Sequence, residues 1–208
     1  MPLVSQQDLV TAAIAAQVVS FPTDTVPALA VRPQNSALIY ELKQREATKP
    51  LILMAATLEQ IWPYLEGNER ERKIWQGTMD IYWPGALTLV LPGSQDLPRE
   101  INPRQDRTIG VRIPHEAIAL EILHQTGPLA TTSANLSGQP ALEKLAEIAA
   151  TFPSVYCLDC LDLEAEEPIG GGRPSTVAQW DTATERWQIL RQGEVWLGEQ
   201  LISGEEQD

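Results

Sequence analysis

The chain is poor in the residues that build metal and disulfide sites, with 2 cysteines and 2 histidines among 208 residues. Cys157 and Cys160 form a C-x-x-C pair, a spacing found in redox motifs and as half of a zinc site. No second cysteine pair exists, and His115 and His124 lie far upstream, so four ligands cannot be assembled locally. The pattern favours buried or incidental thiols, and we expect no metal site built by the protein alone.

Positively charged residues are also scarce. The sequence has 15 lysines and arginines against 28 aspartates and glutamates, which gives a formal net charge of −13. Stable binding to a phosphate backbone needs clustered cations, so tight nucleic-acid binding is not expected from this balance. A local basic cavity is still compatible with it.

Long hydrophobic runs are missing as well. No apolar stretch approaches the ~20 residues that span a bilayer, and the first residues lack the basic segment of a secretory signal. We therefore expect no membrane partner and a cytoplasmic location. The length favours one domain over residues 1–208, with an acidic tail at about 203–208.

Hydropathy patterns predict helices alternating with short strands. Ser5 and Asp8 have capping-box spacing ahead of an amphipathic helix. Further helices are predicted at 35–46, 69–80, 116–125 and 141–150. Strands are predicted at 18–21, 51–54, 86–91, 108–113, 128–131, 155–158, 176–180 and 187–190, the last two as an antiparallel pair, with loops at 94–107 and 159–167. This order predicts an α/β fold in which helices cover the faces of a mixed sheet.

Polar clusters follow several predicted strands, at the position where α/β sheets bind ligands. The richest is 131–139, where hydroxyl and amide side chains including Ser133 and Asn135 end an apolar strand. Thr23, Asp24 and Thr25 follow the strand at 18–21, and taken alone they are typical of a turn or a helix cap.

Three cations, Lys43, Arg45 and Lys49, lie between a helix and a strand. The helix dipole attracts cations to such a place, but Lys49 lies beyond the last helical turn, and the group suits a polyphosphate. Thr108 and Arg112 are four apart on a strand and so share a face. They either line one pocket or form an exposed pair on an edge strand.

A glycine run at 170–172 precedes Arg173, Pro174 and Ser175 but lacks the spacing of a P-loop. It is compatible with a flap over a site or with a mobile linker, and by itself the composition favours a linker.

In this order, the motifs resemble those of the YrdC-like threonylcarbamoyl-AMP synthase family. The matching segments span nearly the whole chain: Phe21–Thr25, Lys43 with Arg45 and Lys49-Pro50, Trp83–Thr88, Thr108–Pro114, Ser133–Gly138, Pro174–Val177 and Leu190–Gly193. Because the sequence stops soon after the last motif, the resemblance is to the short, single-domain form.

The resemblance implies an open, twisted sheet with a positively lined cavity. It also implies an enzyme that makes L-threonylcarbamoyladenylate from L-threonine, bicarbonate and ATP, with Mg²⁺, and releases pyrophosphate. Downstream threonylcarbamoyl-transferase proteins would then modify adenosine 37 of certain tRNAs. The acidic charge fits weak or indirect contact with the tRNA itself.

Site residues follow from the same resemblance. The implied catalytic residues are Lys43 and Arg45. The implied ATP-binding residues are Lys43, Arg45, Lys49, Thr108, Ser133, Asn135 and Arg191. The implied threonine-binding residues are Thr25, Arg112, Thr131 and Ser175.

Some positions depart from the family pattern. The family usually continues its first motif with an aromatic residue and glycine, whereas here the residues that follow are Val26-Pro27-Ala28-Leu29. Glu46 replaces a frequent proline, and Met54 stands where some longer members have histidine. The alternative is a YciO-like paralogue without synthase activity that acts as an RNA- or ribosome-associated binding protein. A general nucleotide hydrolase is a weaker option, because no water-activating residue is evident. The retained basic and polar motifs favour the synthase.

Overall fold

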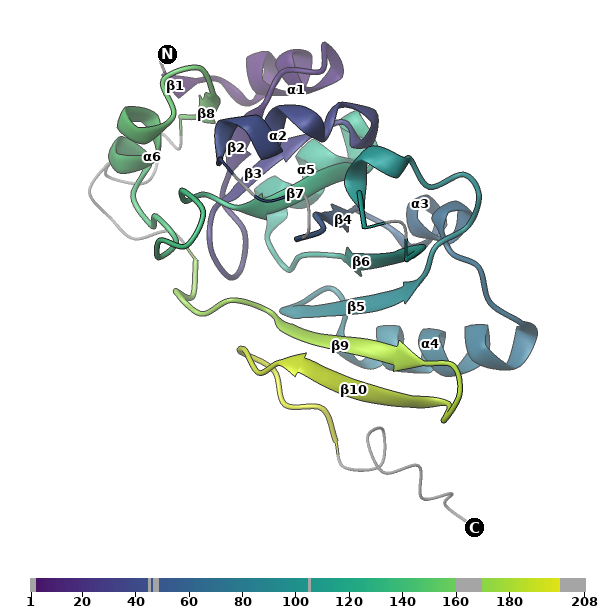
Figure 1. Cartoon of the computed structure of the whole chain (residues 1–208). Coiled ribbons are helices and arrows are strands. Elements are labelled where there is room, and N and C mark those ends of the chain that lie inside the picture. The colour runs from purple at the N-terminus through teal and green to yellow at the C-terminus, as the bar shows by residue number, and fades with distance from the viewer. Residues whose placement is uncertain (1–2, 45, 47–48, 105, 160–169, 199–208) are drawn as a thin grey trace.

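The computed structural model describes residues 3–44, 46, 49–104, 106–159 and 170–198, the side chains at 145 and 146 excepted (Figure 1). Arg45 and Cys160 lie outside these residues, as do the acidic tail at 203–208 and most of the predicted loop at 159–167. The single-domain organisation stays a prediction. Among the described helices, none combines the length and apolar character that crossing a membrane requires.

The described strands form a single twisted sheet in the order β1-β8-β2-β3-β7-β4-β6-β5-β9-β10 (Figure 1). Their bounds are β1 Leu3–Val4, β2 Val19–Phe21, β3 Ala28–Val31, β4 Ile52–Met54, β5 Leu87–Pro92, β6 Thr108–Arg112, β7 Leu129–Ser133, β8 Tyr156–Leu158, β9 Thr176–Asp181 and β10 Arg186–Arg191. Parallel pairs (β1–β8, β2–β8, β4–β6 and β5–β9) stand beside antiparallel ones, including the predicted β9–β10 pair. The expected mixed sheet is therefore confirmed.

The helices are α1 Gln6–Ile14, α2 Ala37–Leu42, α3 Leu58–Ile61, α4 Glu69–Tyr82, α5 Ala117–Thr126 and α6 Leu145–Thr151. Ser5 caps α1 as predicted, because its hydroxyl accepts a hydrogen bond of 3.2 Å from the Asp8 amide. Two predicted helices are shorter than expected: a 3₁₀ turn at Pro33–Asn35 precedes α2, and α6 begins only at Leu145.

The two faces of the sheet are covered differently, which positions the site. On one face, α1 and α5 pack on apolar residues of β2, β3 and β7, with Phe21, Ala30 and Leu129 among them. On the other face, helices α2, α3 and α4 cover the core, and α4 packs against β5, β9 and β10 through Trp75, Trp180 and Trp187. The first face is therefore left open over β4, β6, β5 and β9, where the cavities described below lie.

Strand β3 is one element that the sequence patterns did not predict. All four residues from Ala28 to Val31 are buried, and β3 pairs antiparallel with both β2 and β7. A short strand buried on both faces shows no alternation of apolar and polar residues, so the hydropathy pattern does not identify it as a strand. The available signal was an apolar run of four between Pro27 and Pro33.

Candidate functional site

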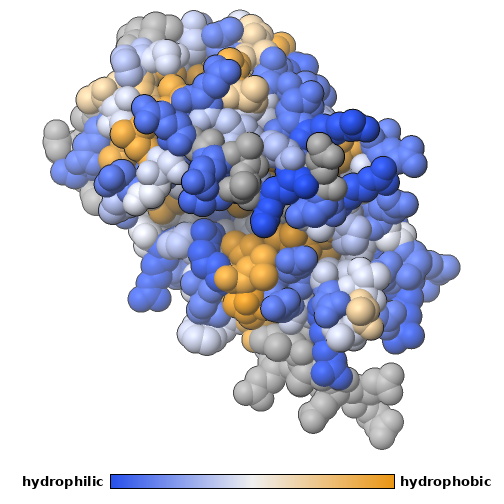
Figure 2. Space-filling model, in the orientation of Figure 1, coloured by the Kyte–Doolittle hydropathy of each residue, from blue (hydrophilic) through white to orange (hydrophobic). Residues whose placement is uncertain are grey.

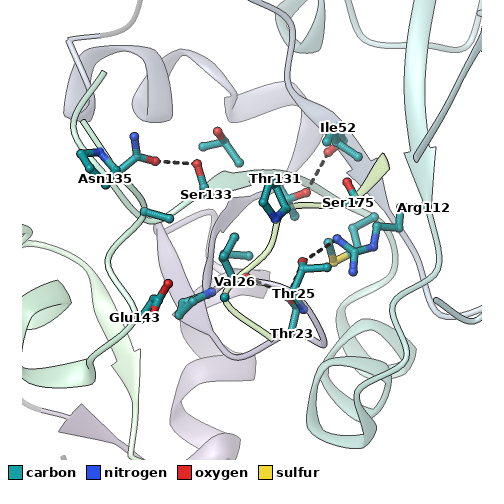
Figure 3. Close-up of a pocket in the computed structure, with 18 of the residues that line it drawn as sticks. Thr23, Thr25, Val26, Ile52, Arg112, Thr131, Ser133, Asn135, Glu143 and Ser175 are labelled. Carbon is teal, nitrogen blue, oxygen red and sulfur yellow. Dashed lines mark hydrogen bonds between the residues drawn. The ribbon is translucent and has the colours of Figure 1, made fainter. Parts of the chain in front are cut away.

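A cavity of about 430 Å³ lies on the open face of the sheet (Figure 3). Its described lining comes from the turn between β2 and β3, from β4, from the ends of β6 and β7, from the loop after β7 as far as Glu143, and from Gly172, Pro174 and Ser175. At one end Thr25, Arg112, Thr131 and Ser175 lie close together. At the other end lie Ser133, the last residue of β7, and Asn135 in the loop after it (Figure 3). The cavity thus gathers motifs that are distant in the sequence.

Arg112 is the buried cation of the first end. Its guanidinium donates hydrogen bonds to the Gly85 carbonyl from Nε (3.0 Å), to Thr25 Oγ1 from Nη1 (2.8 Å) and to Asp24 Oδ1 from Nη2 (2.6 Å). The residue is 4% exposed yet still borders the cavity. Burial lowers the pKa of Arg112, the Asp24 carboxylate raises it and nearby Arg191 lowers it further. An arginine stays cationic through such shifts, so the site has a fixed positive charge.

The turn at Thr23–Thr25 holds these partners in place. Thr23 Oγ1 accepts from the Thr25 amide (3.2 Å) and lies 2.7 Å from the Val26 carbonyl, to which it donates. The segment links two antiparallel strands and no helix begins here, so the alternative of a helix cap is wrong. A turn braced by its own hydroxyl presents Thr25 to the guanidinium with little freedom.

Lys43 lies behind the loop that follows β7. It is 1% exposed, and its ammonium donates to the Ser133 carbonyl and, at 3.0 Å, to Asn135 Oδ1. The Asn135 amide nitrogen in turn donates to the carbonyls of Leu136 (2.8 Å) and Gln139 (2.7 Å). The structure therefore brings Lys43, Ser133 and Asn135 together as the sequence predicted, with the lysine bracing the loop.

A second hollow of about 270 Å³ adjoins the first and shares Pro50, Ile52 and Arg191 with it. Thr108 and Gly110 form its floor, and a Cβ at Gly110 would lie 3.3 Å from the Thr88 methyl group. Apolar side chains gather on this face over β5, β9 and β10 (Figure 2). Leu190, which is 52% exposed, lines the second hollow.

Thr108 and Arg112 share a face of β6 as predicted, but they line different hollows. Strand β6 lies between β4 and β5, so the alternative of an exposed edge-strand pair is wrong. The Thr108 hydroxyl donates to Asp106 Oδ1 at 2.9 Å. Burial acts to raise the pKa of Asp106. Hydrogen bonds from the Thr108 amide, the Thr108 hydroxyl and the Asn102 side chain, with the positive charge of Arg104, together hold that pKa below its ordinary value.

The glycine segment packs on the β2–β3 turn. The Gly171 amide donates to the Asp24 carbonyl (3.3 Å) and the Gly172 amide to the Thr25 carbonyl (3.0 Å). Gly170 has φ +81°, and a Cβ there would lie 2.4 Å from the Thr25 carbonyl oxygen. Its described part is therefore a strap over the turn, and the interpretation as a free linker is wrong for residues 170–172.

Beyond the strap, Ser175 is 3% exposed and lines the cavity. Its hydroxyl lies 2.8 Å from Thr88 Oγ1, and its carbonyl accepts from Arg191 Nη2 at 2.8 Å. Thr131 also lines the cavity and donates to the Ile52 carbonyl at 3.1 Å. All four residues predicted to bind threonine thus line one cavity.

The other predicted cations are placed less fully. Arg45 lies outside the described residues, and Lys49 is not part of the described lining of either hollow. Three lining or bracing residues were missed by sequence reasoning: Asp24, Glu143 and Ile52. Asp24 was visible within a polar cluster, but its partner Arg112 is 88 residues away. Glu143 carried no signal, because one acidic residue after a loop is ordinary.

The described residues offer few ligands for a metal ion. Within the described ranges, no group of three or more histidine, cysteine, aspartate or glutamate side chains is arranged to hold an ion. The carboxylate of Asp24 is taken by Arg112, which leaves Glu143 as the carboxylate in the described lining of the larger cavity.

Comparison with known proteins gives a consistent result. The Sua5/YciO/YrdC family model, described as telomere recombination, matches residues 13–193. A threonylcarbamoyl-AMP synthase of Klebsiella pneumoniae is 34% identical over 139 residues, which cover 65% of this chain and 72% of that protein.

Two solved structures share the fold. P. abyssi Sua5 complexed with L-threonine superposes with a TM-score of 0.77 at 29% identity; the match covers 92% of this chain but 56% of that chain, so this protein spans little more than half its length. E. coli YciO gives a TM-score of 0.74 at 22% identity, covering 91% of this chain and 90% of that one. On the match of the family model to most of its length, the chain belongs to the Sua5/YciO/YrdC family.

Proposed function

We propose that this protein is an L-threonylcarbamoyladenylate synthase, which converts L-threonine, bicarbonate and ATP into the adenylate and pyrophosphate for modification of tRNA at position 37. The observation that carries the proposal is the buried Arg112 at the end of a cavity lined by hydroxyl groups, next to a polar loop braced by Lys43. The printed names of the relatives, and the threonine bound by the P. abyssi protein, support the same activity.

L-Threonine would bind at the Arg112 end of the cavity. Three of the five guanidinium N–H groups of Arg112 donate to described protein atoms, which leaves one on each terminal nitrogen. Two such groups form a fork that matches a carboxylate. The hydroxyl groups of Thr25, Thr131 and Ser175 surround the remaining space, so they would contact the rest of the amino acid.

ATP would extend from the loop after β7 toward the second hollow. Ser133 and Asn135 would contact the phosphates, with Lys43 placing its charge directly behind them. Arg191 lines both hollows and would neutralise phosphate charge between them. Thr108 lines the second hollow, whose lining is part apolar and part polar, and would contact the nucleoside. Arg45 and Lys49, assigned from the sequence, would add further cations.

The reaction needs positioning and charge neutralisation more than a dedicated acid or base. The threonine amine and bicarbonate combine to a carbamate with loss of water. A carbamate oxygen then forms a bond to the α-phosphorus while the bond from that phosphorus to the bridging oxygen of pyrophosphate breaks. Cations near the phosphates stabilise the charge of such a displacement, and this would be the catalytic role of Lys43 and Arg45.

Mg²⁺ fits this site as a companion of ATP. Proteins usually hold Mg²⁺ through one or two carboxylates together with substrate phosphates. Here Glu143 is the residue that would anchor the ion from the protein side, and the ion would neutralise phosphate charge. Lys43, Arg191 and the loop after β7 would still orient the nucleotide.

The proposed product is an intermediate that other proteins consume. Downstream threonylcarbamoyl-transferase proteins in the cytoplasm would receive the adenylate and modify the tRNA. A formal net charge of −13 supports weak or indirect contact between this protein and tRNA.

The test is pyrophosphate release by the purified protein with ATP, Mg²⁺ and bicarbonate, with and without L-threonine. Release that requires both threonine and bicarbonate, with the adenylate identified by mass spectrometry, is the expected result. A folded protein that binds ATP but releases no pyrophosphate would overturn the proposal in favour of the YciO-like alternative. In that case tRNA binding with a steep dependence on salt would identify the RNA-binding function.

A further inference from the structure

We propose that Asp24 is a positioning residue, whose carboxylate aims the guanidinium of Arg112 so that its remaining N–H fork faces the substrate carboxylate. The inference rests on the proposed function, because it concerns how the same cavity recognises L-threonine. It adds a residue that neither the sequence motifs nor the cavity lining assigns to the reaction.

The first argument is the arrangement of donors around Arg112. Nη2 of Arg112 donates to Asp24, Nη1 donates to Thr25 and Nε donates to the Gly85 carbonyl. The guanidinium is therefore held at three points by two segments of the fold, the β2–β3 turn and the residues before β5. A planar group held at three points cannot rotate about its terminal bonds without breaking a hydrogen bond. The direction of its unused fork is therefore set by the protein before substrate binds.

The second argument is charge and burial. The side chains of Arg112 and Asp24 are 5% and 15% exposed, and the pair is joined at 2.6 Å. A buried guanidinium without a charged partner is costly, so the Asp24 carboxylate also stabilises the folded protein. Loss of the charge alone should lower the melting temperature, while an acceptor oxygen in the same place still sets the direction of the guanidinium.

The third argument is that Asp24 is itself held firmly. It lies between Thr23 and Thr25 in the braced turn, and its carbonyl accepts the Gly171 amide from the strap. Asp24 is not among the described residues that line the cavity, so it acts through Arg112 and not on the substrate. Because the backbone of the turn is held in place, the length of the Asp24 side chain sets the position of its carboxylate and therefore of the guanidinium bonded to it.

Two substitutions separate position from charge. Asp24→Asn keeps the length of the side chain and an acceptor oxygen but loses the charge. Asp24→Glu keeps the charge but moves the carboxylate by one methylene group within a tightly packed contact. Positioning predicts that Asp24→Glu raises the Kd for L-threonine about tenfold or more, while Asp24→Asn raises it about threefold or less.

The measurement is titration calorimetry of wild-type protein and both variants with L-threonine and, separately, with ATP. We expect the Kd for ATP to change less than about threefold in both variants, because the contacts of Ser133 and Asn135 are untouched. Asp181→Glu and Asp181→Asn serve as matched controls. Asp181 lies at the turn after β9 and is in the described lining of neither hollow, so these variants should leave the Kd for L-threonine and the Kd for ATP unchanged. Thermal melting verifies that each variant is folded.

The outcomes are distinct. Threonine binding by Asp24→Glu that equals wild type, or a larger loss in Asp24→Asn than in Asp24→Glu, would overturn the positioning role while leaving the proposed function intact. Equal weakening of threonine and ATP binding would also overturn it, since that is the mark of a merely structural ion pair. Absence of threonine binding by the wild-type protein would overturn the proposed function and this inference together.

Discussion

The ammonium of Lys43 lies 3.0 Å from Asn135 Oδ1, across 92 residues of sequence, and joins the end of α2 to the loop after β7. The same ammonium donates to the Ser133 carbonyl, so one buried cation fixes two residues that the proposed function places beside the phosphates. Lys43 thus links the stability of the loop to its proposed role.

Replacement of Lys43 by methionine tests this link. The change leaves the Ser133 carbonyl without the ammonium, and loss of a buried charged hydrogen-bond partner costs about 1–3 kcal/mol of the free energy of unfolding. We expect ATP binding to weaken as well, by about tenfold or more, because the loop loses both its brace and a positive charge. Lys73→Met, at an exposed helix pair with Glu69, is the matched control and should change stability by less than ~0.5 kcal/mol. Urea unfolding and ATP titration measure the two effects, and equal results for the two variants would contradict the role of Lys43.

Replacement of Arg112 by lysine tests the fork. Lysine keeps the charge but cannot hold Gly85, Thr25 and Asp24 together with a carboxylate. We expect the KM for L-threonine to rise about tenfold or more while the KM for ATP changes little. Steady-state pyrophosphate release at varied threonine and at varied ATP measures both constants. A similar rise in both would count against the assignment of Arg112 to threonine.

Replacement of Gly170 by alanine tests the strap. Its φ of +81° disfavours a side chain, and a Cβ would lie 2.4 Å from the Thr25 carbonyl oxygen and 2.7 Å from that of Thr23. We expect the strap to shift and the KM for L-threonine to rise. Gly127→Ala is the control, since Gly127 has φ +75° but no atom within 4 Å of its Cβ position. Both variants should lose stability, but only Gly170→Ala should lose threonine affinity, and kinetics with thermal melting distinguishes them.

Replacement of Glu71 by alanine tests the tryptophan cluster beneath β9 and β10. Glu71 Oε1 accepts from Trp180 Nε1 at 3.0 Å, and Oε2 accepts from the Asn68 amide at 2.9 Å. The variant leaves a buried indole N–H unpaired and removes half of the capping box, so we expect a loss of about 2 kcal/mol in the free energy of unfolding. Exposed Glu69→Ala should cost much less. Guanidinium unfolding followed by tryptophan fluorescence is the measurement, and a loss no greater than that of Glu69→Ala would disprove the role.

Alkaline pH tests the burial of Cys157. Burial raises the pKa of this thiol from its ordinary value of 9.0 to about 11. The folded protein holds its proton longer than the unfolded chain does, so stability is fully present below the unfolded pKa and falls as pH rises from 9.0 toward 11. We expect urea unfolding under reducing conditions to show this fall relative to Cys157→Ala. Parallel pH profiles of the two proteins would contradict it.

The local elements were predictable because their signals are local. The cap at Ser5, the strand at 128–131 and the β9–β10 pair each depend on a few adjacent residues. The structure confirms them, with the strand extended to Ser133. Strand β3 was not predicted, because a short strand buried on both faces has no alternation of apolar and polar residues. The bounds of α2 were predicted too wide, because helix ends are set by contacts with the rest of the fold.

The sequence by itself determined the α/β class, the family and the set of polar motifs. Hydropathy periods and the order of the motifs can be read directly along the chain, without knowledge of which residues meet in space. Only the tertiary structure decided which motifs meet. In the folded chain Arg112 pairs with Asp24, and Lys43 lies behind Asn135. Thr108 lines the second hollow, and the glycine strap packs on the β2–β3 turn. Such choices depend on the order and twist of the strands, which bring together residues almost a hundred positions apart and which no local pattern records.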